Sequence, residues 1–501
     1  MRAGLRGLQL PLIAAALIQT APGDSARTIP DLARIARDCC VRVSSAGDSA
    51  SGVLVGRDGH ILTVAHGIAP QATTVRVIRN NVQVTGDVLL RDAQADVALL
   101  KISPDDIPRL RAIAVSMTDS QPKQGDFVLA AGFPARQKQL PHAIIRSGRL
   151  MATQPVLRST CRLTAGDSGG PILNGAGHLV GINQRIGMIR DQNLHLPAAH
   201  CIRAVKARFT LRTVRTAQQQ SVPTVTPAAR QTLNEYSAAI IDDEGRQLGS
   251  ATRLGARLFV TKLSLVPSGD KLRLRWKSRL LTVSHQKHVR ASDLLFLETD
   301  VETDAALKTS LPAFGRVVWG VSGVPGIISR AETQEPRQRP SLGCTVDELE
   351  GGVAVTRISA DSWAFRCGLK PGDKLQSVAG AEVRTLDDLG DILQDFNPGD
   401  RLPVTWMRGS QKKVSASDLD QSSDQLLDRQ EHLDGRAGLL SLRRTGFQRV
   451  FQHDVPSGLN GMGGPVVDSN GRLTGINIAV RSRESVLAIP VDEVLKNYSQ
   501  R

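Results

Sequence analysis

Two stretches of this chain, 294 residues apart, carry nearly the same sequence. Gly471-Arg-Leu-Thr-Gly-Ile-Asn477 repeats Gly177-His-Leu-Val-Gly-Ile-Asn183, and Gly-Gly-Pro precedes both, beginning at Gly463 and Gly169. An internal repeat constrains the fold strongly, because both copies must adopt the same topology. A chain of 501 residues also exceeds what one hydrophobic core usually serves. We therefore expect roughly two to four domains, two of them copies of one fold.

The spacing of the two copies changes along the chain. Ser292-Asp-Leu-Leu-Phe-Leu297 resembles Ala95-Asp-Val-Ala-Leu-Leu100 at an offset of only 197 residues, whereas the later motifs are 294 residues apart. The second copy is therefore longer by 97 residues between these two points. That length is sufficient for one small inserted domain.

Three segments of the first copy carry side chains for nucleophilic catalysis. His66 ends the apolar segment that starts at Gly59, Asp96 opens an apolar strand, and Ser168 lies in the glycine-rich turn Ala165–Pro171. A serine hydroxyl becomes a good nucleophile when an imidazole removes its proton, and a buried carboxylate holds that imidazole in the required tautomer. The order and spacing predict a triad of His66, Asp96 and Ser168.

The glycines around Ser168 have a predicted role of their own. They allow a sharp turn in which the N–H groups of Gly166 and Ser168 converge. Two such donors form an oxyanion hole, in which each donor stabilises the transition state by about 2.7–4 kcal/mol.

These segments resemble the trypsin-like fold in its bacterial form, the HtrA or Deg proteases, from about residue 38 to 203. The resemblance implies two six-stranded antiparallel β-barrels with the triad in the cleft between them. It also implies an exported serine endopeptidase that cleaves unfolded or extended polypeptides through an acyl-enzyme, needs no cofactor or metal, and serves protein quality control. The alternative is a catalytically inactive peptide-binding scaffold built on the same domains.

One residue of the turn departs from the HtrA pattern. Asp167 stands where these proteases usually have Asn, and in the digestive trypsin branch this aspartate pairs with a newly freed N-terminus. No such N-terminal sequence is present, so Asp167 needs another partner or stays exposed. By resemblance, Arg162 lies near the floor of the S1 substrate pocket, where it either favours an acidic P1 residue or points to solvent, and His195 borders that pocket.

The second copy lacks the catalytic side chains. When Thr261 is aligned with Thr63, Ser264 takes the place of the histidine and Met462 that of the serine, and only Asp293 remains. Loss of nucleophile or base costs roughly 10⁶ in turnover in another serine protease. The copy is therefore predicted to be degenerate, and either supports the first domain or binds a partner in its disused cleft.

Residues 341–416 resemble a bacterial PDZ domain of the kind that follows HtrA proteases. The resemblance rests on Ser341-Leu-Gly-Cys344, on Gly352–Ile358 and on Cys367-Gly-Leu-Lys-Pro-Gly-Asp373. It implies a binding site for peptide C-termini, to which a peptide adds as a further strand.

By the same resemblance, the loop that holds the peptide carboxylate consists of Leu342, Gly343 and Cys344. Three leucines at helical spacing either line the peptide groove or form the core face of their helix; they are Leu386, Leu389 and Leu393.

The predicted fold is mostly β: two trypsin-like double β-barrel domains, the second degenerate, plus an inserted α+β PDZ domain. The predicted boundaries are 1–26 for a signal peptide, 28–203 for the protease domain, 204–232 for a linker, 233–335 and 430–501 for the degenerate domain, and 341–416 for the PDZ domain.

The N-terminus has the order of a secretory signal peptide. Arg2 and Arg6 precede an apolar stretch from Leu8 to Ile18, which is too short for an ordinary membrane span. We expect cleavage near residue 21 or 26 and a periplasmic or extracellular protein with no membrane span after removal of the signal. The alternative is an ordinary amphipathic helix.

The net charge of +15 favours acidic surfaces in a non-specific way. No aromatic stacking motif accompanies the scattered Lys and Arg, so no specific nucleic-acid binding is expected. The expected partners are polypeptide substrates and peptide C-termini. A homo-oligomer is compatible with the resemblance, although HtrA trimers commonly use aromatic residues near the N-terminus and none precedes Phe127 here.

The chain has six cysteines, none with metal-ligand spacing. Either Cys161 pairs with Cys201 and Cys344 with Cys367, or the thiols stay free and buried.

Overall fold

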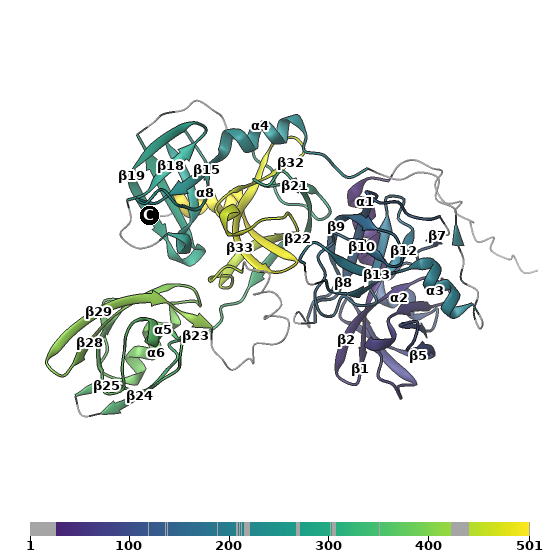
Figure 1. Ribbon diagram of the computed structural model, residues 1–501, viewed down its shortest axis with the longest axis horizontal. Coiled ribbons are helices and arrows are strands. Elements are labelled where there is room, and N and C mark those ends of the chain that lie inside the picture. The colour runs from purple at the N-terminus through teal and green to yellow at the C-terminus, as the bar shows by residue number, and fades with distance from the viewer. Residues whose placement is uncertain are drawn as a thin grey trace, which may run out of the picture.

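A computed structural model describes residues 27–499 except 119, 136, 138, 188, 207–208, 210, 212, 215–220, 267–270, 301, 303–306, 350 and 422–439. The predicted signal peptide, residues 1–26, lies outside this part. The described chain forms two pairs of β-barrels and a smaller domain, shown in Figure 1 from purple at the N-terminus to yellow at the C-terminus. The prediction of a mostly β fold is confirmed.

The first barrel is closed in the order β1-β2-β3-β6-β5-β4. Its core consists of aliphatic side chains such as Val41, Leu54 and Leu100, as expected where no aromatic residue precedes Phe127. The strands are β1 Cys40–Ser45, β2 Asp48–Leu54, β3 His60–Thr63, β4 Thr74–Arg79, β5 Val82–Asp92 and β6 Val97–Lys101.

The second barrel is formed by β8 to β13 and closes where β11 pairs with β12. The short strands β7 and β14 extend it at the β12 edge in parallel. The strands are β7 Met117–Thr118, β8 Phe127–Gly132, β9 Ile144–Ala152, β10 Leu157–Ser159, β11 Pro171–Asn174, β12 Leu179–Arg185, β13 Asn193–Pro197 and β14 Thr213–Val214.

Helix α1 (Ile29–Cys39) links the two barrels of the first pair. It begins at Thr28, whose hydroxyl accepts a hydrogen bond from the Asp31 amide at 3.3 Å. Its apolar face packs on β8 and β11 of the second barrel, and its end runs directly into β1 of the first. The short helices α2 (Asp106–Leu110) and α3 (Ala198–Val205) complete this pair.

The second barrel pair repeats this plan. Helix α4 (Pro227–Tyr236) runs directly into β15, as α1 runs into β1, and α8 (Val491–Ser499) follows the last strand, as α3 does in the first pair. Six residues predicted as linker, 227–232, therefore belong to the helix that opens the second copy.

The second pair consists of a third and a fourth closed barrel. The strands of the third barrel are β15 Ser237–Ile241, β16 Gln247–Arg253, β17 Leu258–Lys262, β18 Arg273–Trp276, β19 Arg279–Val289 and β20 Leu294–Thr299. The strands of the fourth barrel are β21 Val317–Trp319, β22 Pro325–Glu335, β31 Phe447–His453, β32 Pro465–Asp468, β33 Leu473–Ser482 and β34 Ser485–Pro490.

The smaller domain is inserted between β22 and β31 of the fourth barrel, and Figure 1 shows it in green beside the second pair. The strands β23 (Pro340–Ser341) and β30 (Asp420–Gln421) pair where the chain enters and leaves it. Its other elements are β24 Cys344–Leu349, β25 Gly352–Ile358, α5 Trp363–Arg366, β26 Lys374–Val378, β27 Ala381–Glu382, α6 Leu386–Gln394, β28 Arg401–Arg408 and β29 Gln411–Asp418.

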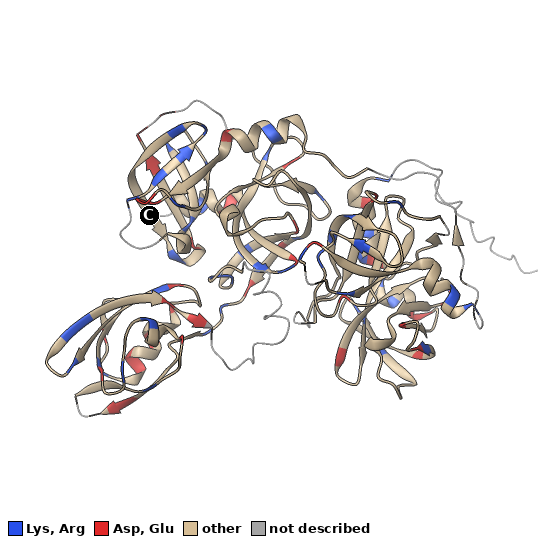
Figure 2. Ribbon diagram, in the orientation of Figure 1, with Lys and Arg blue, Asp and Glu red and all other residues tan. Residues whose placement is uncertain are grey.

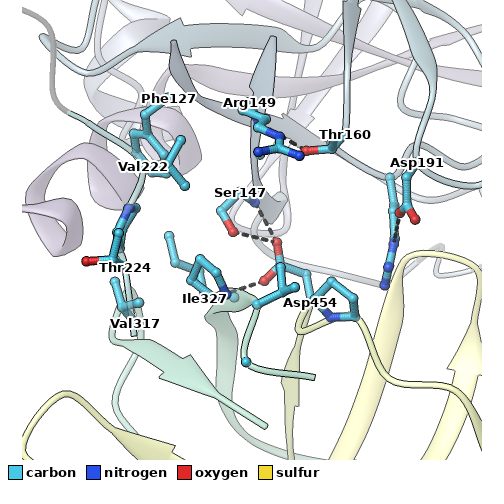
Figure 3. A pocket seen from close by; sticks show the side chains of 18 of the residues that line it. Phe127, Ser147, Arg149, Thr160, Asp191, Val222, Thr224, Val317, Ile327 and Asp454 are labelled. Atoms are coloured by element: carbon cyan, nitrogen blue, oxygen red, sulfur yellow. Dashed lines mark hydrogen bonds and ion pairs between the residues drawn. The ribbon is translucent and has the colours of Figure 1, made fainter. Parts of the chain in front are cut away.

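The two barrel pairs are packed against each other through β9 and β22. The buried carboxylate of Asp454 joins them, because it accepts hydrogen bonds from Ser147 of β9 and from the amide of Ile327 of β22. A cavity of about 640 Å³ lies beside this contact (Figure 3).

Lys and Arg are spread over all domains and interspersed with Asp and Glu (Figure 2). In the described part of the chain no helix has the length and apolar character needed to cross a membrane. All six cysteines are free thiols, so the pairings Cys161–Cys201 and Cys344–Cys367 are not formed. Desolvation in the interior raises the pKa of Cys161 to about 12.

Candidate active site

His66 and Asp96 come together at the junction of the first barrel pair. His66 lies in a 3-10 turn (η1, Ala65–Gly67) just after β3, and Asp96 lies just before β6, which pairs with β3. His66 Nδ1 is 2.9 Å from Asp96 Oδ1 and 3.0 Å from Oδ2, and the His66 amide donates to Oδ1 at 3.1 Å. The imidazole is thus fixed with Nδ1 toward the carboxylate, and no residue in the described part of the chain bonds its other nitrogen.

The carboxyl of Asp96 has a lowered pKa. Burial alone raises this pKa, but the hydrogen bonds from His66 and from Gln184 more than offset the effect. Gln184 Nε2 donates to Asp96 Oδ2 at 3.0 Å. The carboxylate is therefore ionised at neutral pH, as needed to stabilise an imidazolium.

Ser168 lies in the turn between β10 and β11, half-buried at the barrel junction. Its carbonyl accepts a hydrogen bond from the Ser51 amide of β2 at 2.8 Å, which ties the turn to the first barrel. Its hydroxyl donates to the Gln184 carbonyl at 3.2 Å. Among the described residues no hydrogen bond joins this hydroxyl to His66, so in this state it is directed at Gln184.

Gln184 is a site residue that the sequence analysis missed. Its side chain holds Asp96 and its carbonyl receives the Ser168 hydroxyl. A signal was present, because Gln184 directly follows the repeated motif and the second copy has Ile478 at that position.

The predicted oxyanion turn has two unused donors. Gly166 has a φ of 94°, and its carbonyl accepts a hydrogen bond from the Ser51 hydroxyl at 2.7 Å. That hydroxyl in turn accepts from the Phe133 amide at 2.9 Å. Within the described part of the chain, the amides of Gly166 and Ser168 have no acceptor. Both donors are therefore available to an incoming oxygen.

Asp167 is fully buried, and its partner is Arg146 of β9. The guanidinium Nη2 lies 3.0 Å from Asp167 Oδ2, neither side chain reaches solvent, and the Thr164 amide donates to the same oxygen at 2.8 Å. Burial raises the pKa of Asp167 to about 6 against the attraction of Arg146. An arginine in the apolar run Ile144-Ile-Arg146 was the available sequence signal.

The two residues expected in the S1 pocket are both bonded to other side chains. Arg162 Nε is 2.6 Å from Asp191 Oδ1, and both residues line the cavity between the barrel pairs, where Figure 3 labels Asp191. His195 is fully buried and hydrogen-bonded through both nitrogens, to Ser159 at 2.7 Å and Asn183 at 3.0 Å. Desolvation lowers the pKa of His195 to about 3, so this imidazole is neutral.

In the inserted domain, the predicted carboxylate loop precedes β24. Gly343 has a φ of 61°, and a Cβ there would clash with the Ser362 side chain, so the turn requires glycine. The Gly343 amide donates to Ser341 Oγ at 3.1 Å. Leu342 is mostly buried and Cys344 is partly buried as the first residue of β24.

Strand β24 is an edge of the inserted sheet and contacts α6. On α6, Leu389 is 4% exposed and belongs to the core, Leu393 packs against that core, and Leu386 is 41% exposed. Only one of the three leucines is thus presented to solvent.

The aligned residues of the second pair are differently bonded. Asp293 forms a buried ion pair with Lys262 and accepts the Ser264 hydroxyl at 2.9 Å. Met462 is fully buried.

The barrel pair that holds His66, Asp96 and Ser168 defines the chain as a trypsin-like serine peptidase. Residues 50–182 match the family model of the trypsin-like peptidase domain, and residues 340–416 match that of the PDZ domain. The described part of the chain has no group of three or more His, Cys, Asp or Glu placed to hold a metal ion.

Curated relatives agree with these domains. A probable periplasmic serine endoprotease, DegP-like, from Hahella chejuensis is 24% identical over 407 residues, which is 72% of this chain and 78% of that protein. One from Pseudomonas fulva is 31% identical over 141 residues, 27% of this chain and 29% of that protein. The serine endoprotease from Yersinia pestis, a crystal structure, aligns over 80% of this chain and 100% of its own with 17% identity and a TM-score of 0.32. The chain is a serine protease with a trypsin-like peptidase domain and a PDZ domain, and it is similar to DegP-like serine endoproteases.

Proposed function

We propose that this protein is an endopeptidase that cleaves unfolded or extended polypeptides through an acyl-enzyme on Ser168. The observation that carries the proposal is the arrangement at the barrel junction. An ionised Asp96 fixes His66, and the turn with Ser168 offers two unused amides.

In the proposed reaction, the Ser168 hydroxyl turns from the Gln184 carbonyl to His66 Nε2, which takes its proton. The oxygen bonds to the scissile carbonyl carbon, and the electron pair of the C=O bond moves to the carbonyl oxygen between the amides of Gly166 and Ser168. Each of these donors contributes about 2.7–4 kcal/mol to transition-state stabilisation.

Collapse of this intermediate breaks the C–N bond, and His66 gives its proton to the leaving amine. A water molecule then attacks the acyl-enzyme with His66 as base, and Ser168 is regenerated. The negative charge of Asp96 stabilises the imidazolium in both halves of the reaction.

The inserted domain is proposed to bind peptide C-termini. Its open edge strand β24 offers main-chain donors and acceptors for an added strand, and the loop of Leu342, Gly343 and Cys344 begins that strand. The exposed Leu386 on the neighbouring helix supplies an apolar contact for the peptide side chains.

We further propose that the protein is exported and acts in the periplasm on damaged or unfolded polypeptides. Two observations support this location: basic residues precede an apolar stretch within residues 1–18, and the similar curated proteins are named as periplasmic endoproteases.

Cleavage of casein by residues 27–501 tests the proposal. Ser168→Ala should abolish cleavage. Ser264 aligns with His66 in the second copy, and Ser264→Ala should leave the rate of cleavage within about twofold of wild type. Thermal unfolding of both variants controls for loss of fold. Equal activity of Ser168→Ala and wild type, or no activity of the wild type, would contradict the proposal.

A further inference from the structure

Residues 187–193 run from the loop after β12 into the first residue of β13, and all but residue 188 lie in the described part of the chain; we call this segment the 187–193 loop. It begins just after Gln184, whose carbonyl receives the Ser168 hydroxyl. Asp191 of this loop pairs with Arg162 at 2.6 Å, and Arg162 lies on the segment that leads into the Ser168 turn. The 187–193 loop is therefore linked to the Ser168 turn through the Arg162–Asp191 ion pair and through Gln184.

An arginine from the second barrel pair holds this loop. Arg483, in the tight turn between β33 and β34, is only 2% exposed. Its Nη2 lies 2.7 Å from the Gly187 carbonyl, 3.0 Å from that of Ile189 and 3.2 Å from that of Arg190. A fourth acceptor, Asn193 Oδ1, is 3.2 Å away.

The loop returns hydrogen bonds to the same turn. Arg190 Nε donates to the Arg483 carbonyl at 2.7 Å, and Arg190 Nη2 donates to the Ser482 carbonyl at 3.4 Å. The loop also closes on itself, because the Gly187 amide and the Arg190 carbonyl both bond the Asn193 side chain. Arg483 thus joins a network that already spans the loop from end to end.

The energetics favour one arrangement of these groups. A guanidinium removed from water is costly unless its donors are satisfied, and main-chain carbonyls that lose a buried donor incur a desolvation penalty. The contacts of Arg483 Nη2 with the loop carbonyls therefore stabilise both partners. These contacts link the loop to a residue some 290 positions away along the chain.

We propose that Arg483 is a positioning residue for proteolysis, through which the degenerate barrel pair sets the substrate-binding wall of the active pair. The inference rests on the proposed function. The second copy then has a function that requires no ligand in its own cleft, because Arg483 in the turn between β33 and β34 holds the 187–193 loop of the first pair.

The same strand offers a matched control. Arg481 lies two residues before Arg483, and its Nε bonds Glu335 Oε2 at 2.8 Å within the fourth barrel. Arg481→Ala thus removes a partly buried ion pair from the same domain without changing a residue that contacts the 187–193 loop. Arg483→Lys keeps a cation with three donors but loses the planar fork, so it should restore function in part.

The test measures kcat and KM for fluorescent casein in the full chain, together with the rate at which a fluorophosphonate labels Ser168. In Arg483→Ala we expect a KM raised about tenfold or more, with kcat and the labelling rate within about threefold of wild type. A small labelling reagent needs the triad and the oxyanion turn but little of the substrate wall. Arg483→Lys should fall between wild type and Arg483→Ala, and Arg481→Ala should match wild type.

Hydrogen exchange provides a second readout without turnover. Peptides that include residues 187–193 should exchange faster in Arg483→Ala than in Arg481→Ala, with the rest of the first barrel pair unchanged. An unchanged KM and unchanged exchange in Arg483→Ala would overturn the inference. So would a parallel loss of labelling and cleavage. A wild-type protein that is not labelled would overturn the proposed function as well, which separates the two failures.

Discussion

The two barrel pairs place Ser168 and Met462 at the same point between their barrels. The Ser51 amide donates to the Ser168 carbonyl at 2.8 Å, and the Ser250 amide donates to the Met462 carbonyl at 2.9 Å. Two further hydrogen bonds occur in both pairs. Thr63 Oγ1 donates to the Ser51 carbonyl, as Thr261 Oγ1 donates to the Ser250 carbonyl, both at 2.7 Å. The Gly169 amide donates to the Asn183 carbonyl, as the Gly463 amide donates to the Asn477 carbonyl, both at 2.7 Å.

The matched aspartates have the same backbone and different partners. Asp96 and Asp293 have φ angles of 55° and 56°, a left-handed conformation that non-glycine residues seldom adopt. Asp96 holds an imidazole, whereas Asp293 is neutralised by the buried ammonium of Lys262. The second carboxylate is therefore committed to a structural ion pair.

The two turns also differ in their amides. In the second copy the chain before Met462 forms a 3-10 turn (η4, Leu459–Gly461), and the Met462 amide donates to the Leu459 carbonyl at 2.9 Å. In the first copy the corresponding Ser168 amide has no acceptor in the described residues. The second cleft thus lacks the oxyanion donor as well as the nucleophile and base.

This comparison teaches which features the barrel junction needs. The matched hydrogen bonds involve main-chain groups and threonine hydroxyls, which persist whatever side chain occupies the catalytic positions. Catalysis depends on a few side chains and on the conformation of one turn. These features differ between the two barrel pairs, whereas the main-chain hydrogen bonds of the junction are the same.

The largest expected difference between the copies is in turnover. Asp96→Asn should lower kcat for casein about 10⁴-fold, because the wrong imidazole tautomer is then favoured. The same substitution at Asp293 should leave kcat of the folded protein unchanged within about twofold. A comparable loss of turnover in both variants would contradict the assignment of catalysis to the first cleft.

Asp293→Asn should instead lower stability. It leaves Lys262 buried without its counter-ion, a change that typically costs about 3–5 kcal/mol. Lys262→Met in the Asp293→Asn background should recover most of that free energy of unfolding, measured by chemical denaturation. A double variant as unstable as the single one would show that the ion pair is not the cause.

A smaller effect is expected from two buried histidines, one in each barrel pair. Burial lowers the pKa of His195 to about 3 and that of His453 to about 4, whereas an unfolded chain has a value of about 6.5. Below pH 6.5 the unfolded state binds protons that the folded state does not. Stability is therefore fully present above pH 6.5 and is lost as the pH falls toward 4, by on the order of 3 kcal/mol per imidazole.

Unfolding temperatures across pH 4–8 measure this effect. His453→Gln should flatten the acid limb relative to wild type, and His195→Gln should do the same in the first pair. An acid limb as steep as that of wild type in both variants would contradict the assignment.

The smallest effect is expected from restoring the missing side chains. Ser264→His combined with Met462→Ser, in a Ser168→Ala background, should give no detectable casein cleavage. Lys262 still neutralises Asp293, and the turn before position 462 still uses its amide. Measurable cleavage would show that these two obstacles do not matter.

Short local motifs made the class of enzyme and the fold predictable. The residues beside His66, Asp96 and Ser168, the internal repeat and the glycine pattern of the inserted domain are all visible without tertiary contacts. These features support the confirmed predictions of a trypsin-like serine protease with a PDZ domain.

The partner of each buried charge was not predictable in the same way. Arg146 contacts Asp167 across 21 residues, and Arg483 contacts the 187–193 loop across 290 residues. Such pairings depend on which strands the barrels bring together and on what desolvation leaves unpaired. Asp167 and Arg162 could be recognised as unusual from the sequence, but their partners came only from packing.

Mass-spectrometric mapping of fluorophosphonate labelling on the intact chain compares the two clefts most directly. We expect one label per molecule, on Ser168, and none on Ser264 or elsewhere in the second barrel pair. A chain that stays unlabelled at Ser168, or that carries the label in the second pair, would contradict an active first cleft beside a degenerate second one.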